Sequence, residues 1–210
     1  MESAEGLKRL LNESGVSVES DCARQMLQYL SLLEKWNSRI NLTSARDWDA
    51  LEALFREAVW ASGMYPSAAR THLDIGSGAG FPAIILRILN PGIQLEMVES
   101  RGKKAAFLET LFHALNLNEA RVYPERLGMF LSRSDRTRVW DCISWKGLRL
   151  NSHDLLQLRK HTQTHTQLWM FHGKYPAIED PAAMKPVFKL IRREKFPARE
   201  ESYLSIYLPL

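Results

Sequence analysis

Apolar residues in the first third of the chain recur at helical spacing. One stripe begins near Ser20 and Asp21 and consists of Met26, Leu27, Leu30, Leu33 and Trp36. A second helix is expected after Ser44, where Asp47 stands three residues later as in a capping box. Its apolar positions are Leu51, Leu54, Phe55, Ala58 and Val59. These stripes predict a helical N-terminal extension over residues 1–66.

From residue 71 the pattern changes to short β-prone runs that alternate with amphipathic segments. Strands are expected at residues 71–75, 93–98, 120–123, 139–144, 167–171, 187–192 and 203–208, and helices at 81–89, 101–115 and 152–165. This alternation predicts a mainly parallel, Rossmann-like sheet covered on both faces. The last two strands have no helix between them and predict an antiparallel hairpin at one edge. The sequence thus predicts one α/β domain over residues 1–210, with its core at 67–210.

Composition excludes several classes of protein. The hydrophobic share of 45% and the charged share of 25% are those of globular chains. The apolar runs at residues 83–86 and 203–208 are far shorter than the roughly 20 residues of a membrane span, and residues 1–13 lack the apolar core of a signal peptide. Cys22 and Cys142 give neither a disulfide framework nor metal-ligand spacing. We therefore expect a cytoplasmic protein with no membrane partner and no metal.

Basic residues are gathered in clusters. The net charge is +4, and the three clusters are Arg101, Lys103 and Lys104; Arg133, Arg136 and Arg138; and Lys189, Arg192, Arg193 and Lys195. Such clusters suit phosphate contacts and steering towards a polyanion. They are equally typical of solvated faces and helix C-termini, so both interpretations stay open.

The strongest local signal is the segment HLDIGSGAGFP at residues 72–82. Gly76, Gly78 and Gly80 stand between an expected strand and an expected helix, and glycine allows a positive φ and close approach to a ligand. Glu99 follows the next strand, where an acidic residue accepts hydrogen bonds from ribose hydroxyls. Alternatively, Glu99 stabilises the dipole of the following helix.

The glycine spacing and Asp74 discriminate between nucleotide-like cofactors. Dinucleotide-binding turns prefer Gly-x-Gly-x-x-Gly, whereas this turn has Gly-x-Gly-x-Gly. A carboxylate two residues before the first glycine repels phosphates and favours the amino group of S-adenosylmethionine. These residues therefore predict S-adenosylmethionine in preference to a dinucleotide.

Three segments resemble the GidB/RsmG methyltransferases. They are LLEKWNSRINLTSARD at 32–47, LDIGSGAGFPAIIL at 73–86 and VESRGKKAAFLETL at 98–111. The resemblance is stronger before residue 118 than after it. It implies a class I methyltransferase fold and methyl transfer from S-adenosylmethionine to N7 of a guanosine in small-subunit rRNA, with the rRNA or a ribosomal particle as partner.

The resemblance also implies roles for individual residues. Asp74 and the three glycines would line the methionine side of the cofactor, Glu99 would hold the ribose, and Arg126 would stand where the chain passes the adenine. The predicted cofactor-binding set is Asp74, Gly76, Gly78, Gly80, Phe81, Glu99, Ser100, Arg126 and Leu127. Asn37 and Asn41 either belong to this family signature for function or simply cap helix ends.

The chain departs from the family on the expected substrate side. A family Arg-His pair is Arg56-Glu57, an Asp-Ser pair is Trp60-Ala61, a Ser-Arg-Ala run is Ser144-Trp145-Lys146, and a Lys-Gly pair is His172-Gly173. The cofactor side is almost intact. Two alternatives therefore stay open: a methyltransferase with another acceptor, and a cofactor-binding protein without catalysis.

The chemistry implied for guanine N7 needs no general base, because N7 already carries a lone pair. The protein must align acceptor and methyl group and exclude water, and cationic groups would hold a phosphate or the guanine O6 edge. Arg126, Lys146 and His172 are the predicted catalytic, substrate-contacting residues. Trp145, placed just beyond a strand, is predicted to stack on a substrate base, whereas Trp36 and Trp169 are predicted to be core residues.

Overall fold

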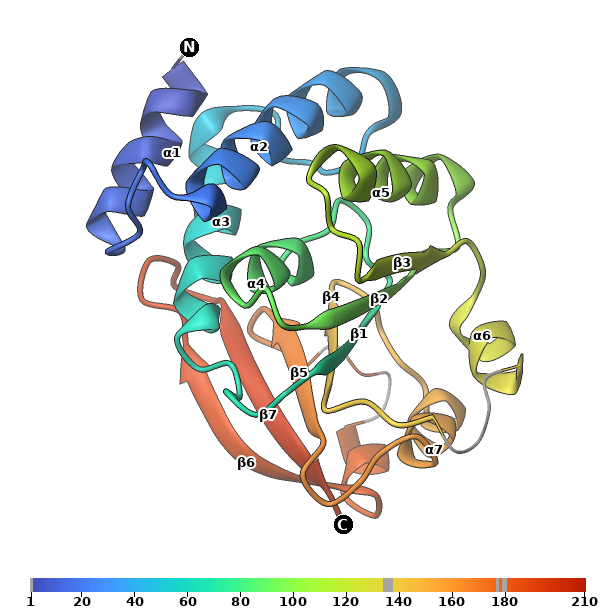
Figure 1. Cartoon of the computed structure of the whole chain (residues 1–210). Coiled ribbons are helices and arrows are strands. Elements are labelled where there is room, and N and C mark those ends of the chain that lie inside the picture. The colour runs from blue at the N-terminus through green and yellow to red at the C-terminus, as the bar shows by residue number, and fades with distance from the viewer. Residues whose placement is uncertain (1, 134–137, 177, 179–180) are drawn as a thin grey trace.

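The described residues form helices and strands in the predicted alternation (Figure 1). A computed structural model describes residues 2–133, 138–176, 178 and 181–210, so Arg136 of the second basic cluster lies outside them. The helices are α1 Glu2–Glu13, α2 Asp21–Ile40, α3 Trp48–Ser62, α4 Ala83–Leu89, α5 Gly102–Ala114, α6 Leu127–Arg133, α7 Ser152–Arg159 and the 3-10 helix η1 Pro181–Met184. The strands are β1 Thr71–Ile75, β2 Gln94–Val98, β3 Ala120–Tyr123, β4 Cys142–Lys146, β5 Gln167–His172, β6 Phe188–Lys195 and β7 Tyr203–Pro209.

The strands make one sheet with the order β3-β2-β1-β4-β5-β7-β6. Strands β1 to β5 are parallel, while β7 runs antiparallel to both β5 and β6. The predicted mainly parallel sheet and its C-terminal antiparallel hairpin are therefore confirmed. The strand order reverses between β1 and β4, and ligands of open α/β sheets bind outside the carboxyl ends of the strands at this position.

Side-chain N-caps mark the starts of α2 and α3 in the N-terminal extension. The Ser20 side chain accepts a hydrogen bond from the amide of Ala23 and begins α2, as predicted. The start predicted at Ser44 for the next helix is wrong, because Asp47 caps α3 by accepting from the amide of Ala50 at 2.9 Å. The preceding loop is instead held by Asn37, which accepts from the Thr43 amide and donates to the Ala45 carbonyl. Asn37 thus orders this loop.

Helices cover both faces of the sheet. One buried cluster joins residues of α1, α2 and α3 to α4, α5 and β2, and Figure 1 shows these helices gathered on the same side. A second cluster joins β1, β4 and β5 to α6 and α7. None of the helices in the described part of the chain is long and apolar enough to cross a membrane.

Element boundaries differ from the predicted ones mainly after residue 123. Helix α6 was not predicted, and α7 ends at Arg159 although the pattern predicted a helix to residue 165. Strand β4 begins at Cys142 and reaches Lys146, whereas residues 139–144 were expected. The carboxylate of the preceding residue, Asp141, accepts from the amides of Arg70 and Thr71 at 2.7 and 2.9 Å and so joins the start of β1 to that of β4.

Candidate functional site

The turn after β1 is built on glycines in the left-handed region. Gly76, Gly78 and Gly80 have φ values of 68°, 57° and 97°. At Gly80 a Cβ atom would lie 2.6 Å from Cγ1 of Ile84, so the close packing of α4 requires glycine there. At Gly78 a Cβ atom would meet only the carbonyl oxygen of Gly76, at 3.8 Å, so this glycine faces open space. The turn therefore exposes backbone on one side and packs against α4 on the other.

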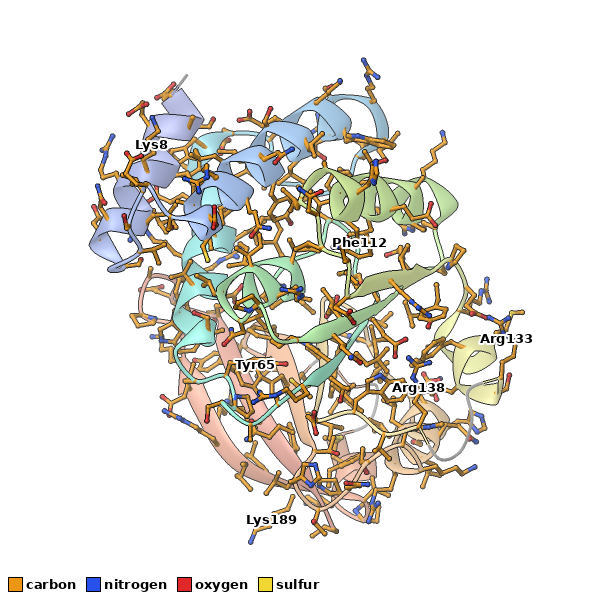
Figure 2. All side chains as sticks on the ribbon, viewed as in Figure 1. Lys8, Tyr65, Phe112, Arg133, Arg138 and Lys189 are labelled. Carbon is orange, nitrogen blue, oxygen red and sulfur yellow. The ribbon has the colours of Figure 1, made fainter. Side chains whose placement is uncertain are left out.

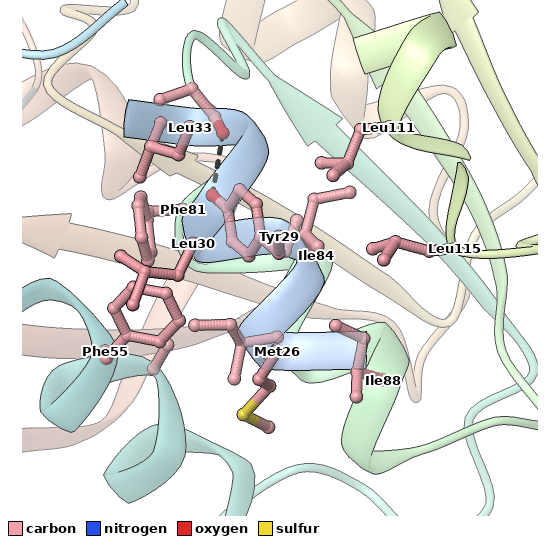
Figure 3. Packing of buried hydrophobic residues seen from close by; sticks show 14 of the residues in the cluster. Met26, Tyr29, Leu30, Leu33, Phe55, Phe81, Ile84, Ile88, Leu111 and Leu115 are labelled. Atoms are coloured by element: carbon pink, nitrogen blue, oxygen red, sulfur yellow. Dashed lines mark hydrogen bonds between the residues drawn. The ribbon is translucent and has the colours of Figure 1, made fainter. Parts of the chain in front are cut away.

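Helix α2 holds the glycine turn in place through a buried hydrogen bond. The buried hydroxyl of Tyr29 donates to the carbonyl of Ala79 at 2.7 Å, and Figure 3 shows this bond inside a cluster that includes Phe55, Phe81 and Ile84. The ring of Tyr29 lies 5.1 Å from that of Phe81 and 5.7 Å from that of Phe55. The N-terminal extension thus sets the position of the turn.

Glu99 links the turn to the start of α5. Its Oε2 accepts from the amide of Gly78 and its Oε1 from the amide of Arg101, both at 2.8 Å. Arg101 is the N-cap residue of α5, so the carboxylate interacts with the helix start and with the glycine turn at once. The two interpretations of Glu99 are therefore compatible in this geometry.

A cavity of about 420 Å³ opens over the turn, within the range typical of small-molecule sites. We call it the cofactor cavity, after the cofactor that the sequence predicts for the glycine turn. Its walls come from the turn, the start of α5, the N-terminal extension and the end of β4. It is lined by Leu42, Thr43, Leu54, Gly76, Ser77, Gly78, Ala79, Phe81, Glu99, Ser100, Arg101, Lys104, Lys146, Gly147 and Leu148. Five of the nine residues predicted to bind the cofactor line it, namely Gly76, Gly78, Phe81, Glu99 and Ser100, and so does Lys146 of the predicted catalytic set.

Asp74 at the end of β1 and Gly80 on the α4 side of the turn do not line this cavity. Asp74 is 1% exposed, and its Oδ1 accepts from the hydroxyl of Ser144 at 2.6 Å. That hydroxyl also lies 2.8 Å from Nε2 of His72. Oδ2 of Asp74 has no hydrogen-bond partner in the described part of the chain. Burial raises the pKa of Asp74 to about 7 and lowers the pKa of His72 to about 3.

A second cavity, of about 640 Å³, adjoins the first. Both are lined by Lys146 and Gly147, and we call the second one the adjoining cavity. It is also bordered by Glu57, Arg149, His172, Tyr175, Arg199 and Ser202. The two spaces therefore meet at the carboxyl end of β4, beside the position where the strand order reverses.

The three predicted substrate-contacting residues have different positions. Lys146 borders both cavities, and its ammonium group forms an ion pair with the carboxylate of Glu57. His172 borders the adjoining cavity only, with Nε2 at 2.9 Å from the Ser205 hydroxyl and Nδ1 at 2.7 Å from the Gly173 carbonyl. Arg126 is exposed on the loop before α6 and lines neither cavity. Leu127, which begins α6, lines neither cavity either.

The predicted stacking role of Trp145 is wrong. Its side chain is 0% exposed, because β4 extends past it and the residue packs in the cluster beneath α6 and α7.

Trp60 lies against Phe196, with ring centroids 5.5 Å apart. Trp169 is buried and Trp36 is half-buried against Phe107, so both pack in the core as predicted. None of these four rings lines the cofactor cavity.

The basic clusters are not equivalent. Arg101 and Lys104 of the first cluster line the cofactor cavity, and the ammonium group of Lys104 donates to the carbonyl of Leu42 at 2.8 Å. In the second, Arg138 forms an ion pair with Glu96. Figure 2 shows Arg138 and Lys189 in separate parts of the molecule. Among the described residues of the three clusters, Arg101 and Lys104 alone line the cavity built around the glycine turn.

Several residues of the site were not predicted as such. Leu42, Thr43 and Lys104 lie inside the segments that resemble the family, but nothing in their spacing distinguished them as cavity residues. Leu54 belongs to a helical apolar stripe, which predicts only burial. Tyr29 carries a hydroxyl beside such a stripe, and this was the one signal available for its bond to the turn.

The chain matches the family described as GidB, rRNA small subunit methyltransferase G, over residues 22–201. It belongs to this family. A ribosomal RNA small subunit methyltransferase G from Pseudomonas aeruginosa (strain LESB58) is 37% identical over 131 residues, covering 62% of this chain and 61% of that protein. One from Chloroflexus aggregans is 37% identical over 125 residues, covering 57% and 52%. This GidB family member thus spans less than two thirds of the length of these curated relatives.

Solved structures with low sequence identity share the fold. An O-methyltransferase from Bacillus cereus in complex with SAH is 16% identical with a TM-score of 0.60, and the match covers 85% of this chain and 90% of that one. MtNAS in complex with MTA and tNA is 12% identical with a TM-score of 0.60, covering 98% and 81%. These similarities, together with the sheet order, establish the class I methyltransferase fold for this GidB family member.

Proposed function

We propose that this chain is an S-adenosylmethionine-dependent RNA methyltransferase that modifies N7 of a guanosine in small-subunit rRNA. The observation that carries the proposal is the meeting of two cavities at Lys146 and Gly147, one of them built around the glycine turn. Membership of the GidB family supports the rRNA substrate. We also infer that residues 1–210 act as one domain, because the extension shares a buried cluster with the α/β core.

The residues of the cofactor cavity fit S-adenosylmethionine. Gly78 presents backbone without a side chain, and the carboxylate of Glu99 beside it has further lone pairs for ribose hydroxyls. When it is ionised, Asp74 at the end of β1 adds a negative potential that favours a cationic ligand, and such a ligand would in turn favour the ionised form of a carboxyl group whose pKa is about 7. The SAH bound to the Bacillus cereus relative supports the same class of cofactor.

The chain's residues act by orientation in this proposal. S-adenosylmethionine supplies a methyl group on a positively charged sulfur, and transfer leaves the neutral thioether. Guanine N7 needs no proton removed, so the protein aligns the two reactants and excludes water. Lys146 and Gly147 line both cavities, which supports a role for Lys146 in contacting an acceptor bound in the adjoining cavity.

The adjoining cavity also motivates a second candidate, a methyltransferase with a different acceptor. Two of its lining residues, Glu57 and His172, stand where the family has histidine and lysine. An acceptor that differs from guanosine would account for these replacements without any change in the cofactor cavity.

Calorimetric titration with S-adenosylhomocysteine tests the cofactor site first. We expect saturable binding that Glu99→Ala weakens at least tenfold, whereas Glu109→Ala, on the exposed face of α5, leaves it unchanged. Methyl transfer from labelled cofactor to purified small subunits and to naked rRNA then tests the acceptor, with nucleoside mass analysis for N7-methylguanosine. No binding by the wild type refutes the function, and binding without methylation of either RNA refutes the acceptor.

A further inference from the structure

The wall between the two cavities is held by residues from three distant segments. Glu57 comes from α3, Lys146 from the end of β4, and Ser202 from the residue before β7. Oε2 of Glu57 pairs with the ammonium group of Lys146, and its Oε1 accepts from the hydroxyl of Ser202 at 2.6 Å. Both carboxylate oxygens of Glu57 therefore have a polar partner. The ion pair holds the ammonium group of Lys146 at the wall that the two cavities share.

Burial makes this pair sensitive to the loss of either charge. The side chain of Glu57 is 4% exposed and that of Lys146 is 25% exposed. A charge removed from water in this way needs a partner, and deleting one member leaves the other uncompensated. Other cations, Arg101 and Lys104, already line the cofactor cavity. Glu57 thus keeps the β4 wall neutral in a cavity that carries positive charge elsewhere.

The position of Lys146 explains why the neutral charge of the Glu57–Lys146 pair matters for methyl transfer. In the sheet, Ile75 is paired with Trp145, so Lys146 follows at the level of the glycine turn. Because Lys146 and Gly147 line both cavities, a cofactor in one cavity and an acceptor in the other would both lie beside these two residues. The sulfur of such a cofactor, if bound near Lys146, would be within reach of the charges of the Glu57–Lys146 pair. S-adenosylmethionine is cationic at this sulfur, and S-adenosylhomocysteine is neutral.

We propose that Glu57 is a positioning residue that neutralises Lys146 and thereby sets the relative affinity of the site for the cationic cofactor and its neutral product. This inference rests on the proposed function. Without the carboxylate, the ammonium group repels the sulfonium and leaves the thioether unaffected. Without the ammonium group, the carboxylate attracts the sulfonium. Removing the Glu57 carboxylate and removing the Lys146 ammonium group are therefore expected to change the ratio of the two ligand affinities in opposite directions.

The test is calorimetric titration of the full chain with both ligands. We expect Glu57→Gln to lower the ratio of S-adenosylmethionine to S-adenosylhomocysteine affinity roughly tenfold, as for unit charges several ångströms apart in a partly screened site. Lys146→Met is expected to raise the ratio, and the double variant to return it to within about threefold of the wild type. Glu52→Gln removes a carboxylate from a more exposed ion pair on the same helix, with Arg56, and is expected to leave the ratio unchanged.

Several outcomes overturn the inference. An affinity ratio that is unchanged in both single variants refutes it. A shift of the ratio in the same direction in both variants also refutes it, because that result would follow from loosened packing and not from opposite changes in charge. If Glu57→Gln does not fold, the comparison of Lys146→Met with the double variant still tests the inference. A charge effect predicts that adding the Glu57 substitution to Lys146→Met returns the affinity ratio towards the wild-type value, which loosened packing would not do. Wild-type protein that binds neither ligand refutes the proposed function and this inference with it, whereas binding with an unaltered ratio refutes the inference alone.

Discussion

The buried carboxyl group of Asp74 makes the stability of the unliganded protein depend on pH in an unusual direction. Burial, only partly offset by the hydrogen bond from Ser144 and the nearby hydroxyl of Ser77, raises the pKa of Asp74 from 3.8 to about 7. A carboxyl group with a raised pKa stabilises the fold when it is protonated. That contribution is fully present below the unfolded pKa and is lost as the pH rises through about 7. Asp74→Asn cannot ionise, so it avoids this loss.

The size of the effect follows from the two pKa values. Each pH unit corresponds to about 1.4 kcal/mol, so the complete loss would be about 4 kcal/mol in a site that does not relax. Between pH 5 and pH 8 the free energy of unfolding of Asp74→Asn, relative to wild type, should rise by about 2 to 3 kcal/mol. His72, whose pKa is lowered to about 3, has the opposite dependence. It is present in both proteins, so its contribution cancels in the difference.

Urea unfolding followed by tryptophan fluorescence at several pH values measures this difference. Asp141→Asn is the matched control. Although burial alone would raise the pKa of Asp141, hydrogen bonds from Arg70 and Thr71 lower it overall. Its carboxylate therefore stabilises the fold above the unfolded pKa, and the variant should lose about 1–3 kcal/mol at neutral pH and less at acid pH. A difference between Asp74→Asn and wild type that is constant with pH would refute the reasoning.

Three further substitutions test the glycine turn. Tyr29→Phe leaves the buried Ala79 carbonyl without its donor and should lower the free energy of unfolding by about 1–3 kcal/mol in urea titrations; an unchanged value would contradict this. Gly80→Ala places Cβ 2.6 Å from Ile84 at a φ of 97° and should destabilise by more than about 2 kcal/mol in thermal unfolding. Gly78→Ala meets open space and should lose only about 1–2 kcal/mol of stability, but at least tenfold in S-adenosylhomocysteine affinity by calorimetry. Retained affinity would show that Gly78 does not contact the ligand.

The local pattern was sufficient to predict several strands of the sheet and the terminal hairpin. The predicted strand bounds 71–75 and 120–123 match β1 and β3, because each β-prone run ends at a sharp change in composition. The terminal hairpin was predictable from the missing helix between two strands. The glycines and Glu99 were recognisable because backbone conformation and strand ends are encoded locally.

Features that depend on distant segments were not predictable. Alternation in a strand means that a small error in its limits changes the environment of a side chain. An expected end at residue 144 therefore left Trp145 outside β4, whereas the strand includes it and buries it. Likewise, Glu57 and Lys146 each stand at a position where the chain departs from the family. Their pairing depends on the packing of α3 against the end of β4, 89 residues along the chain.

The N-terminal extension is part of the site and does more than cover the sheet. Through Tyr29 it holds the turn, through the Leu42 carbonyl it holds Lys104 of α5, and through Glu57 it holds the end of β4. These contacts reach every other wall of the cofactor cavity. Asn37 fixes the loop that brings Leu42 into place, which gives a physical reason why the segment at residues 32–47 occurs together with the glycine turn. A core without its extension would retain the glycines but lose the contacts that orient them.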